Sequence, residues 1–229
     1  MGVYVKIIDE ALREGRTSLS EYESKQVLAS YDLPVTREKL VGNPDDLLEV
    51  AGQIGYPLVI KGCSAAIAHK TEKGLIRVDV RNDDEATAAF REISAAMNGA
   101  SDGTVLVQQL VKGKRELVVG LTRDAQFGPC VMFGLGGIFT EILKDTVFRV
   151  APLEKQDALE MMQEIRASNI LEEFRGMTAV DKDMLAEILL TVGRIGIEND
   201  AIKEIDINPV IISKGKPIAA DALVVLQEL

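Results

Sequence analysis

Two apolar, β-branched segments near the C-terminal end, residues 202–212 and 217–224, constrain the fold most strongly. They flank Ser213-Lys214-Gly215-Lys216, and this arrangement predicts a β-hairpin with a short turn. A two-residue turn at Lys214-Gly215 and a four-residue turn over the whole tetrapeptide give the same register. That register places Asn208 opposite Asp221, so the hairpin brings an amide and a carboxylate together.

Directly opposed side chains on a sheet have Cβ atoms about 4.5–5.5 Å apart, close enough to share a hard cation. Mg²⁺ typically takes a few protein ligands together with phosphate oxygens. Glu204 and Asp206 share the face of Asn208, because side chains alternate along a strand. An edge hairpin with solvated acids would show the same pattern, so the hairpin alone leaves both interpretations open.

The composition is that of a soluble α/β protein, with 229 residues and 47% hydrophobic residues. This length allows one large domain or two closely packed lobes. No apolar run reaches the ~18 residues of a membrane span, and the N-terminus shows no signal peptide, so no membrane partner is expected. Cys63 and Cys130 suggest no disulfide framework, and the expected location is the cytoplasm.

The net charge of −10 argues against nucleic acid as a partner. Acidic residues number 36 against 26 basic ones, and no basic stripe with interleaved aromatic residues is present. A small anionic ligand remains compatible with a few lysines gathered in one place.

The chain alternates between helical and strand patterns. Asn43 and Asn82 each precede a helix that they can cap. Helices are expected at residues 3–14, 20–31, 44–54, 83–97, 154–166 and 182–199, the last weakened by Gly193 and Gly196, and strands at 35–41, 57–62, 75–80, 104–111 and 115–121. These elements predict two α/β lobes joined near residues 108–112, with the first helix packed on the second lobe.

Two basic side chains are candidates for chemistry. Lys61 closes an apolar strand, where it either extends to the surface or meets an anion; Gly62 and the small residues after it favour a phosphate contact. His69 is the only histidine, in a loop of small residues. It is either a surface residue or a nucleophile that forms a covalent intermediate, and a metal site is disfavoured because no second histidine exists.

Gly134-Leu135-Gly136-Gly137 lacks the spacing of a Walker loop or a dinucleotide fingerprint. Its glycines still suit a turn whose amides point at an anion. Glu116, near the expected connection between the lobes, is by itself an ordinary edge charge.

Taken together, these segments resemble one family over essentially the whole chain: the β subunits of ADP-forming acetyl-CoA synthetases, ATP-grasp proteins related to the β subunit of succinyl-CoA synthetase. The resemblance is carried, in this order, by Pro57-Leu58-Val59-Ile60-Lys61-Gly62, His69-Lys70-Thr71, Arg115-Glu116-Leu117-Val118-Val119-Gly120, Phe133-Gly134-Leu135-Gly136-Gly137-Ile138, Glu141-Ile142-Leu143-Lys144-Asp145 and Glu204-Ile205-Asp206-Ile207-Asn208-Pro209.

The resemblance implies an α/β (α+β) ATP-grasp fold of two lobes with the nucleotide bound between them. The first lobe would comprise residues 20–110, and the second residues 1–19 and 111–229 with the Mg²⁺-binding hairpin. The implied cofactors are ATP or ADP and Mg²⁺.

The resemblance also implies roles for individual residues. His69 would be the transiently phosphorylated histidine, and Asn208 and Asp221 the Mg²⁺ ligands. Lys61 would contact nucleotide phosphate and Glu116 would lie near the nucleotide. The adenine would be read mainly through backbone groups of Gln108, Gln109, Leu110 and Val111; further phosphate or loop contacts would come from Lys70, Gly136 and Gly137; and Glu141, Lys144, Asp145 and Arg149 would steady the loop or face a partner.

The implied reaction is acyl-CoA + ADP + phosphate ⇌ carboxylate + CoA + ATP. In the family, an α subunit binds CoA, makes the acyl phosphate and carries a first phosphohistidine, and the expected assembly is an α2β2 heterotetramer. Two other functions remain open. An ATP-grasp carboxylate–amine ligase would need no phosphohistidine, and a nucleotide-sensing module would bind ADP and ATP without turnover.

Overall fold

The computed structural model describes residues 3–65, 74–97, 103–137 and 145–227, with side chains from residue 6 onward. The chain forms two compact units. The smaller unit contains residues 20–22 and 36–110, and the larger unit contains residues 1–19, 23–35 and 111–229. Each unit has its own sheet and its own apolar core.

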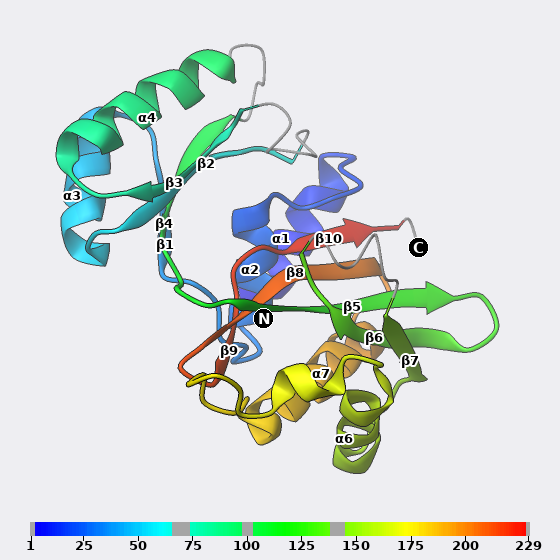
Figure 1. The fold of residues 1–229 in the computed structure, drawn as a ribbon. Coiled ribbons are helices and arrows are strands. Elements are labelled where there is room, and N and C mark those ends of the chain that lie inside the picture. Colours follow the sequence, from blue (N-terminus) through cyan, green and yellow to red (C-terminus); the bar gives the residue numbers. More distant parts are fainter. Residues whose placement is uncertain (1–2, 66–73, 98–102, 138–144, 228–229) are drawn as a thin grey trace. The chain divides into compact units, whose positions relative to one another are not determined.

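The smaller unit is a four-stranded antiparallel sheet with two helices packed on it (Figure 1). Asn43 and Asn82 cap these helices by accepting hydrogen bonds from the backbone N–H groups of Asp46 and Glu85, as predicted. The strand order is β1-β4-β2-β3, with β1 at Glu38–Val41, β2 at Leu58–Cys63, β3 at Ile76–Val80 and β4 at Thr104–Gln109, and the helices are α3 (Pro44–Ile54) and α4 (Asp83–Ala96).

The larger unit is built on an antiparallel sheet of six strands (Figure 1). Its order is β10-β8-β5-β6-β7, and β9 pairs with β8. The strands are β5 (Arg115–Asp124), β6 (Gly128–Leu135), β7 (Thr146–Val150), β8 (Ile202–Ser213), β9 (Lys216–Ala219) and β10 (Leu223–Leu226). The helices are α1 (Val3–Arg13), α2 (Glu21–Ala29), whose first two residues belong to the smaller unit, α6 (Lys155–Glu164), the 3-10 helix η1 (Ser168–Leu171) and α7 (Lys182–Glu198).

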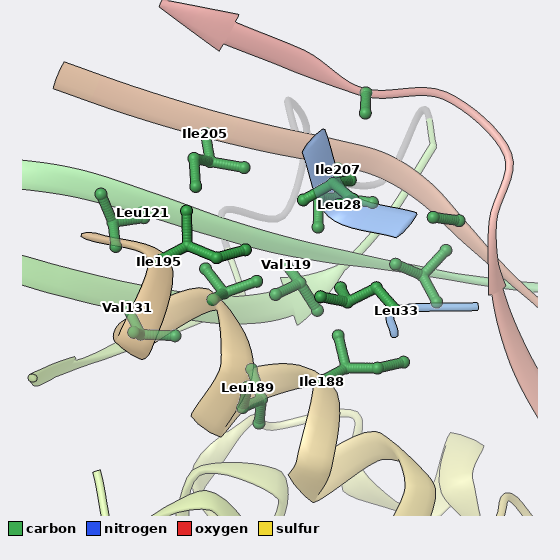
Figure 2. Close-up of a cluster of buried hydrophobic side chains, with 14 of the residues drawn as sticks. Leu28, Leu33, Val119, Leu121, Val131, Ile188, Leu189, Ile195, Ile205 and Ile207 are labelled. Carbon is green, nitrogen blue, oxygen red and sulfur yellow. The ribbon is translucent and has the colours of Figure 1, made fainter. Parts of the chain in front are cut away.

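Helix α7 supplies much of the larger core. Figure 2 shows Ile188, Leu189 and Ile195 of this helix beside side chains of the central strands, such as Val119 and Ile205. Burial of these side chains is the main force that holds the helix on the sheet.

Helix α7 continues through both of its glycines. A Cβ atom at Gly196 would overlap the Cδ1 atom of Leu121, and one at Gly193 would lie 3.3 Å from Cγ2 of Val131. The glycines therefore allow the helix to approach β5 and β6 closely, and packing outweighs their low helix propensity.

Residues 23–35 cluster with the larger unit, whereas the resemblance predicts that they belong to the first lobe. Their apolar side chains explain this, since Val27, Leu28 and Leu33 are buried in the core of the larger unit. Ile8 and Ala11 of α1 belong to the same core. Among the described residues, no helix is both long enough and apolar enough to cross a membrane.

Candidate functional site

The C-terminal hairpin forms as predicted. Ser213 pairs with Lys216, so the turn has two residues, Lys214 and Gly215. Both have positive φ angles, 51° and 83°, which is the backbone requirement of the tight turns that join twisted antiparallel strands.

The predicted register of this hairpin persists beyond the turn. Val210 pairs with Ala219, the N–H group of Ala220 donates to the carbonyl of Pro209 at 3.0 Å, and Leu223 pairs with Asp206. Residues 208 and 221 fall between these pairs, at matching positions on the two segments, and the Asn208-Pro209 peptide bond is cis. The ladders on both sides thus keep the alignment that sets Asn208 against Asp221.

The face of β8 that carries Glu204 and Asp206 is strongly acidic. Ile205 and Ile207 point into the core with 1% and 0% exposure, so Glu204 and Asp206, which alternate with them, point to the opposite face. Burial, followed by the negative charges of Glu204 and Asp221, raises the pKa of Asp206 to about 6. A carboxylate that resists ionisation marks a place where positive charge is favoured.

A divalent cation fits this donor set. The side chains of Asn208 and Asp221 offer hard oxygen ligands, and the neighbouring acids supply the negative potential. Among the residues that the structure describes, no group of three or more His, Cys, Asp or Glu side chains is placed to hold a metal ion. The proposed site has only two protein ligands, one amide and one carboxylate, and the remaining ligands would be phosphate oxygens and water.

The glycine turn after β6 connects this face to Glu116. The N–H group of Gly136 donates to the carbonyl of Glu116 at 2.9 Å, and the N–H group of Gly137 donates to Oδ1 of Asn208 at 3.1 Å. Both amides therefore already have acceptors within the protein. A phosphate bound through them, as the sequence suggested, would have to replace these hydrogen bonds.

Lys61 is buried in β2 of the smaller unit, with 6% exposure, and does not extend to the surface. Its Nζ atom lies 2.6 Å from Oε1 of Glu21, which is 3% exposed. Sequence reasoning missed Glu21, because nothing local links a residue at a helix start to a lysine in a strand 40 positions later.

The connection proposed to read adenine is well ordered by backbone hydrogen bonds within the smaller unit. Gln108 is buried, the N–H group of Gln109 donates to the carbonyl of Arg37 at 2.9 Å, and that of Leu110 donates to the carbonyl of Pro57 at 3.2 Å. These two N–H groups therefore already donate to carbonyl groups of the protein. Val111 is the first residue of the segment 111–229, which belongs to the larger unit.

His69, Lys70, Glu141 and Lys144 lie outside the described residues. Asp145 and Arg149, expected to steady the loop or face a partner, both contact the C-terminal end of α6. The carboxylate of Asp145 accepts hydrogen bonds from the N–H groups of Arg166 and Ala167 at 2.8 and 2.9 Å, and Arg149 forms an ion pair with Glu164. These two residues therefore link β7 to the end of that helix.

Two pockets lie along the outer side of α7, with volumes of about 390 and 280 Å³. Glu187, Thr191 and Arg194 line both of them. None of the predicted site residues lines either pocket, so they are separate from the hairpin site.

The fold belongs to a known class of protein, since the sequence matches the ATP-grasp domain family over residues 10–226. The β subunit of an ADP-forming acetate–CoA ligase from Pyrococcus furiosus is 46% identical over 226 residues, which cover 96% of this chain and 97% of the relative.

Solved structures of one archaeal enzyme have the same fold. The dinucleotide-forming acetyl-coenzyme A synthetase of Ca. Korarchaeum cryptofilum, in complex with coenzyme A, Ca-AMPCP and HgCl+, superposes with a TM-score of 0.93 at 40% identity, covering 97% of this chain and 99% of that one. Another structure of it holds coenzyme A and Mg-AMPPCP, with a phosphohistidine segment pointing towards the nucleotide binding site (TM-score 0.88, 40% identity, 98% and 100% covered). The chain belongs to the ATP-grasp family, among the β subunits of ADP-forming acetate–CoA ligases.

Proposed function

We propose that this chain is the nucleotide-binding β subunit of an ADP-forming acyl-CoA synthetase, with acetyl-CoA as the expected substrate of the complete enzyme. The reaction is acyl-CoA + ADP + phosphate ⇌ carboxylate + CoA + ATP. The observation that carries the proposal is the full-length match to such a β subunit. The hairpin register, which aligns Asn208 with Asp221, supports it independently.

The step assigned to this chain is phosphoryl transfer between His69 and ADP. An oxygen of the terminal ADP phosphate attacks the phosphorus of phosphorylated His69, a P–O bond forms and the P–N bond breaks, and the electron pair of that bond returns to the imidazole nitrogen. Positioning and neutralisation of charge dominate such transfers. His69 is therefore the covalent relay, and the other proposed residues hold the nucleotide in place.

Lys61 is suited to bind a phosphate oxygen. Its ammonium group is buried and held by Glu21, so its position on β2 is fixed before a ligand arrives. A fixed cation loses little conformational freedom on binding, which favours charge-assisted hydrogen bonds to phosphate.

Asn208 and Asp221 would hold Mg²⁺, which when bound neutralises charge on the nucleotide phosphates. Glu116 would lie near the nucleotide, beside the turn of Gly136 and Gly137. The backbone of residues 108–111 would contact the adenine, and Lys70 would assist at the phosphates.

The relative that matches this chain over nearly its full length is a β subunit, which implies a partner subunit. We infer that the partner is a CoA-binding α subunit, that the assembly is α2β2, and that it works in the cytoplasm. The α subunit would make the acyl phosphate and pass its phosphoryl group to His69.

The test is incubation of the purified chain with Mg²⁺ and ATP radiolabelled at the γ-phosphate, first alone and then with the α subunit. We expect an acid-labile, alkali-stable label on wild-type protein and none on His69→Ala, although the variant still binds MgADP. A direct ligase or a nucleotide sensor would give no such label in either preparation. Nucleotide binding without any label, even with the α subunit present, would refute the phosphohistidine mechanism.

A further inference from the structure

The turn at Gly136-Gly137 brings together two residues that the sequence separates widely. The N–H group of Gly136 donates a hydrogen bond to the backbone carbonyl of Glu116 at 2.9 Å. The turn holds Asn208 through the hydrogen bond from Gly137 N–H to Oδ1, at 3.1 Å. One short turn therefore contacts both the backbone of the residue expected near the nucleotide and the side chain of a proposed metal ligand.

The space beside the Cα atom of Gly137 is occupied by the carboxylate of Glu116. A Cβ atom at residue 137 would overlap Oε2 of Glu116 and would lie 3.3 Å from its Cδ atom, but 3.8 Å from its Cβ atom. Only the end of the Glu116 side chain is therefore incompatible with a side chain at position 137. A flexible carboxylate can turn away at little cost, so a methyl group here would move the carboxylate rather than unfold the protein.

We propose that Gly137 is a positioning residue: its missing side chain lets the Glu116 carboxylate lie against the same turn whose amide fixes Asn208. The inference rests on the proposed function, because it assigns the geometry to binding of the metal–nucleotide complex. The turn sets the direction of the Asn208 amide oxygen, which has a second lone pair for a metal, and the place of the Glu116 carboxylate relative to it.

The adjacent glycine has a different role. A Cβ atom at Gly136 would lie 2.5 Å from the carbonyl oxygen of Leu117 and 2.6 Å from its carbonyl carbon. Backbone atoms within a sheet cannot move aside as a side chain can, so Gly136 is required for the fold itself. Gly136 is thus required for the fold, whereas Gly137 is required for the position of the Glu116 carboxylate.

The experiment is a double-mutant cycle of Gly137→Ala and Glu116→Ala, read by the affinity for MgADP in calorimetry. Gly137→Ala should weaken MgADP binding about tenfold, because a displaced carboxylate loses its contact with the ligand. In the Glu116→Ala background the same substitution should change the affinity less than about twofold, since the overlapping atoms are gone.

Gly128→Ala is the matched control. Gly128 also has a positive φ angle, 75° against 62° at Gly137, but a Cβ atom there meets nothing within 4 Å. Gly128→Ala should lower the free energy of unfolding about as much as Gly137→Ala, because both place alanine in the left-handed region, and it should leave the affinity for MgADP unchanged. An equal loss of affinity from Gly137→Ala in both backgrounds, or no loss in either, would overturn the inference.

A ligand-free readout separates this inference from the proposed function. If wild-type protein failed to bind MgADP, the proposed function would fall, and a crystal structure of ligand-free Gly137→Ala would decide the inference. A Glu116 carboxylate displaced from the turn would support it. An unmoved carboxylate would overturn it.

Discussion

Asp206 gives the sharpest test of the electrostatics at the hairpin, because replacing it by asparagine should make the protein more stable. Burial, together with the charges of Glu204 and Asp221, raises its pKa from 3.8 to about 6. The folded protein therefore favours the protonated carboxyl group more than the unfolded chain does. At neutral pH that group is nonetheless ionised, at a cost to the folded state.

The sign and size of the effect follow from proton linkage. Between the unfolded pKa of 3.8 and the folded pKa of about 6, the folded state binds more protons, so stability falls as pH rises through this window. Above about pH 6 the folded state bears the full free-energy cost of ionising Asp206. A shift of about two pKa units corresponds to about 3 kcal/mol, an upper figure because partial hydration screens the charges.

Asp206→Asn should accordingly raise the free energy of unfolding by about 2–3 kcal/mol near pH 7.5 and by well under about 1 kcal/mol near pH 4. Urea unfolding of both proteins across this range measures the difference, and any titration common to both cancels. Glu204→Gln is the control: Glu204 is exposed and contributes only a neighbouring charge, so its effect should be clearly smaller.

Saturating MgADP should reduce the advantage of Asp206→Asn, since a nearby cation favours the ionised carboxylate. An asparagine variant that is no more stable than wild type at neutral pH would refute a raised pKa at Asp206. A stability advantage that does not vary with pH would refute it equally.

Three further outcomes are expected. Glu21→Gln should cost about 3 kcal/mol of unfolding free energy, because it leaves the Lys61 ammonium buried beside a neutral group; adding Lys61→Met should recover most of this in urea unfolding, and no recovery would contradict the pairing. Gly136→Ala should lose more than about 3 kcal/mol and melt well below Gly137→Ala in calorimetry, since its methyl group would meet the backbone of Leu117. Chelation of Mg²⁺ should weaken ADP binding to wild-type protein about tenfold or more but change it little in Asp221→Ala, and an equal loss in both would exclude Asp221 as a metal ligand.

The sequence predicts this structure best where short-range patterns decide it. The register from Ser213 and Lys216 follows from a turn and two alternating strands, and it extends to Asp206 and Leu223 because one strand cannot slip without turning its apolar side chains out of the core. The helix caps at Asn43 and Asn82 are equally local. Strand β7 was not predicted, because it is an edge strand with Phe148 and Val150 half exposed and shows no clear apolar alternation.

The sequence does not show which residues far apart in the chain contact one another in the folded protein. Lys61 was recognisable as a costly buried cation, but its pairing with Glu21 depends on the packing of a helix start against a strand. Gly137 was recognisable as part of a turn able to face an anion. In the folded chain the Glu116 carboxylate lies beside the Cα atom of Gly137, and the Gly137 amide already donates to Oδ1 of Asn208. A glycine-rich turn in a sequence therefore indicates where close approach is possible, and only the packed structure shows which atoms make use of it.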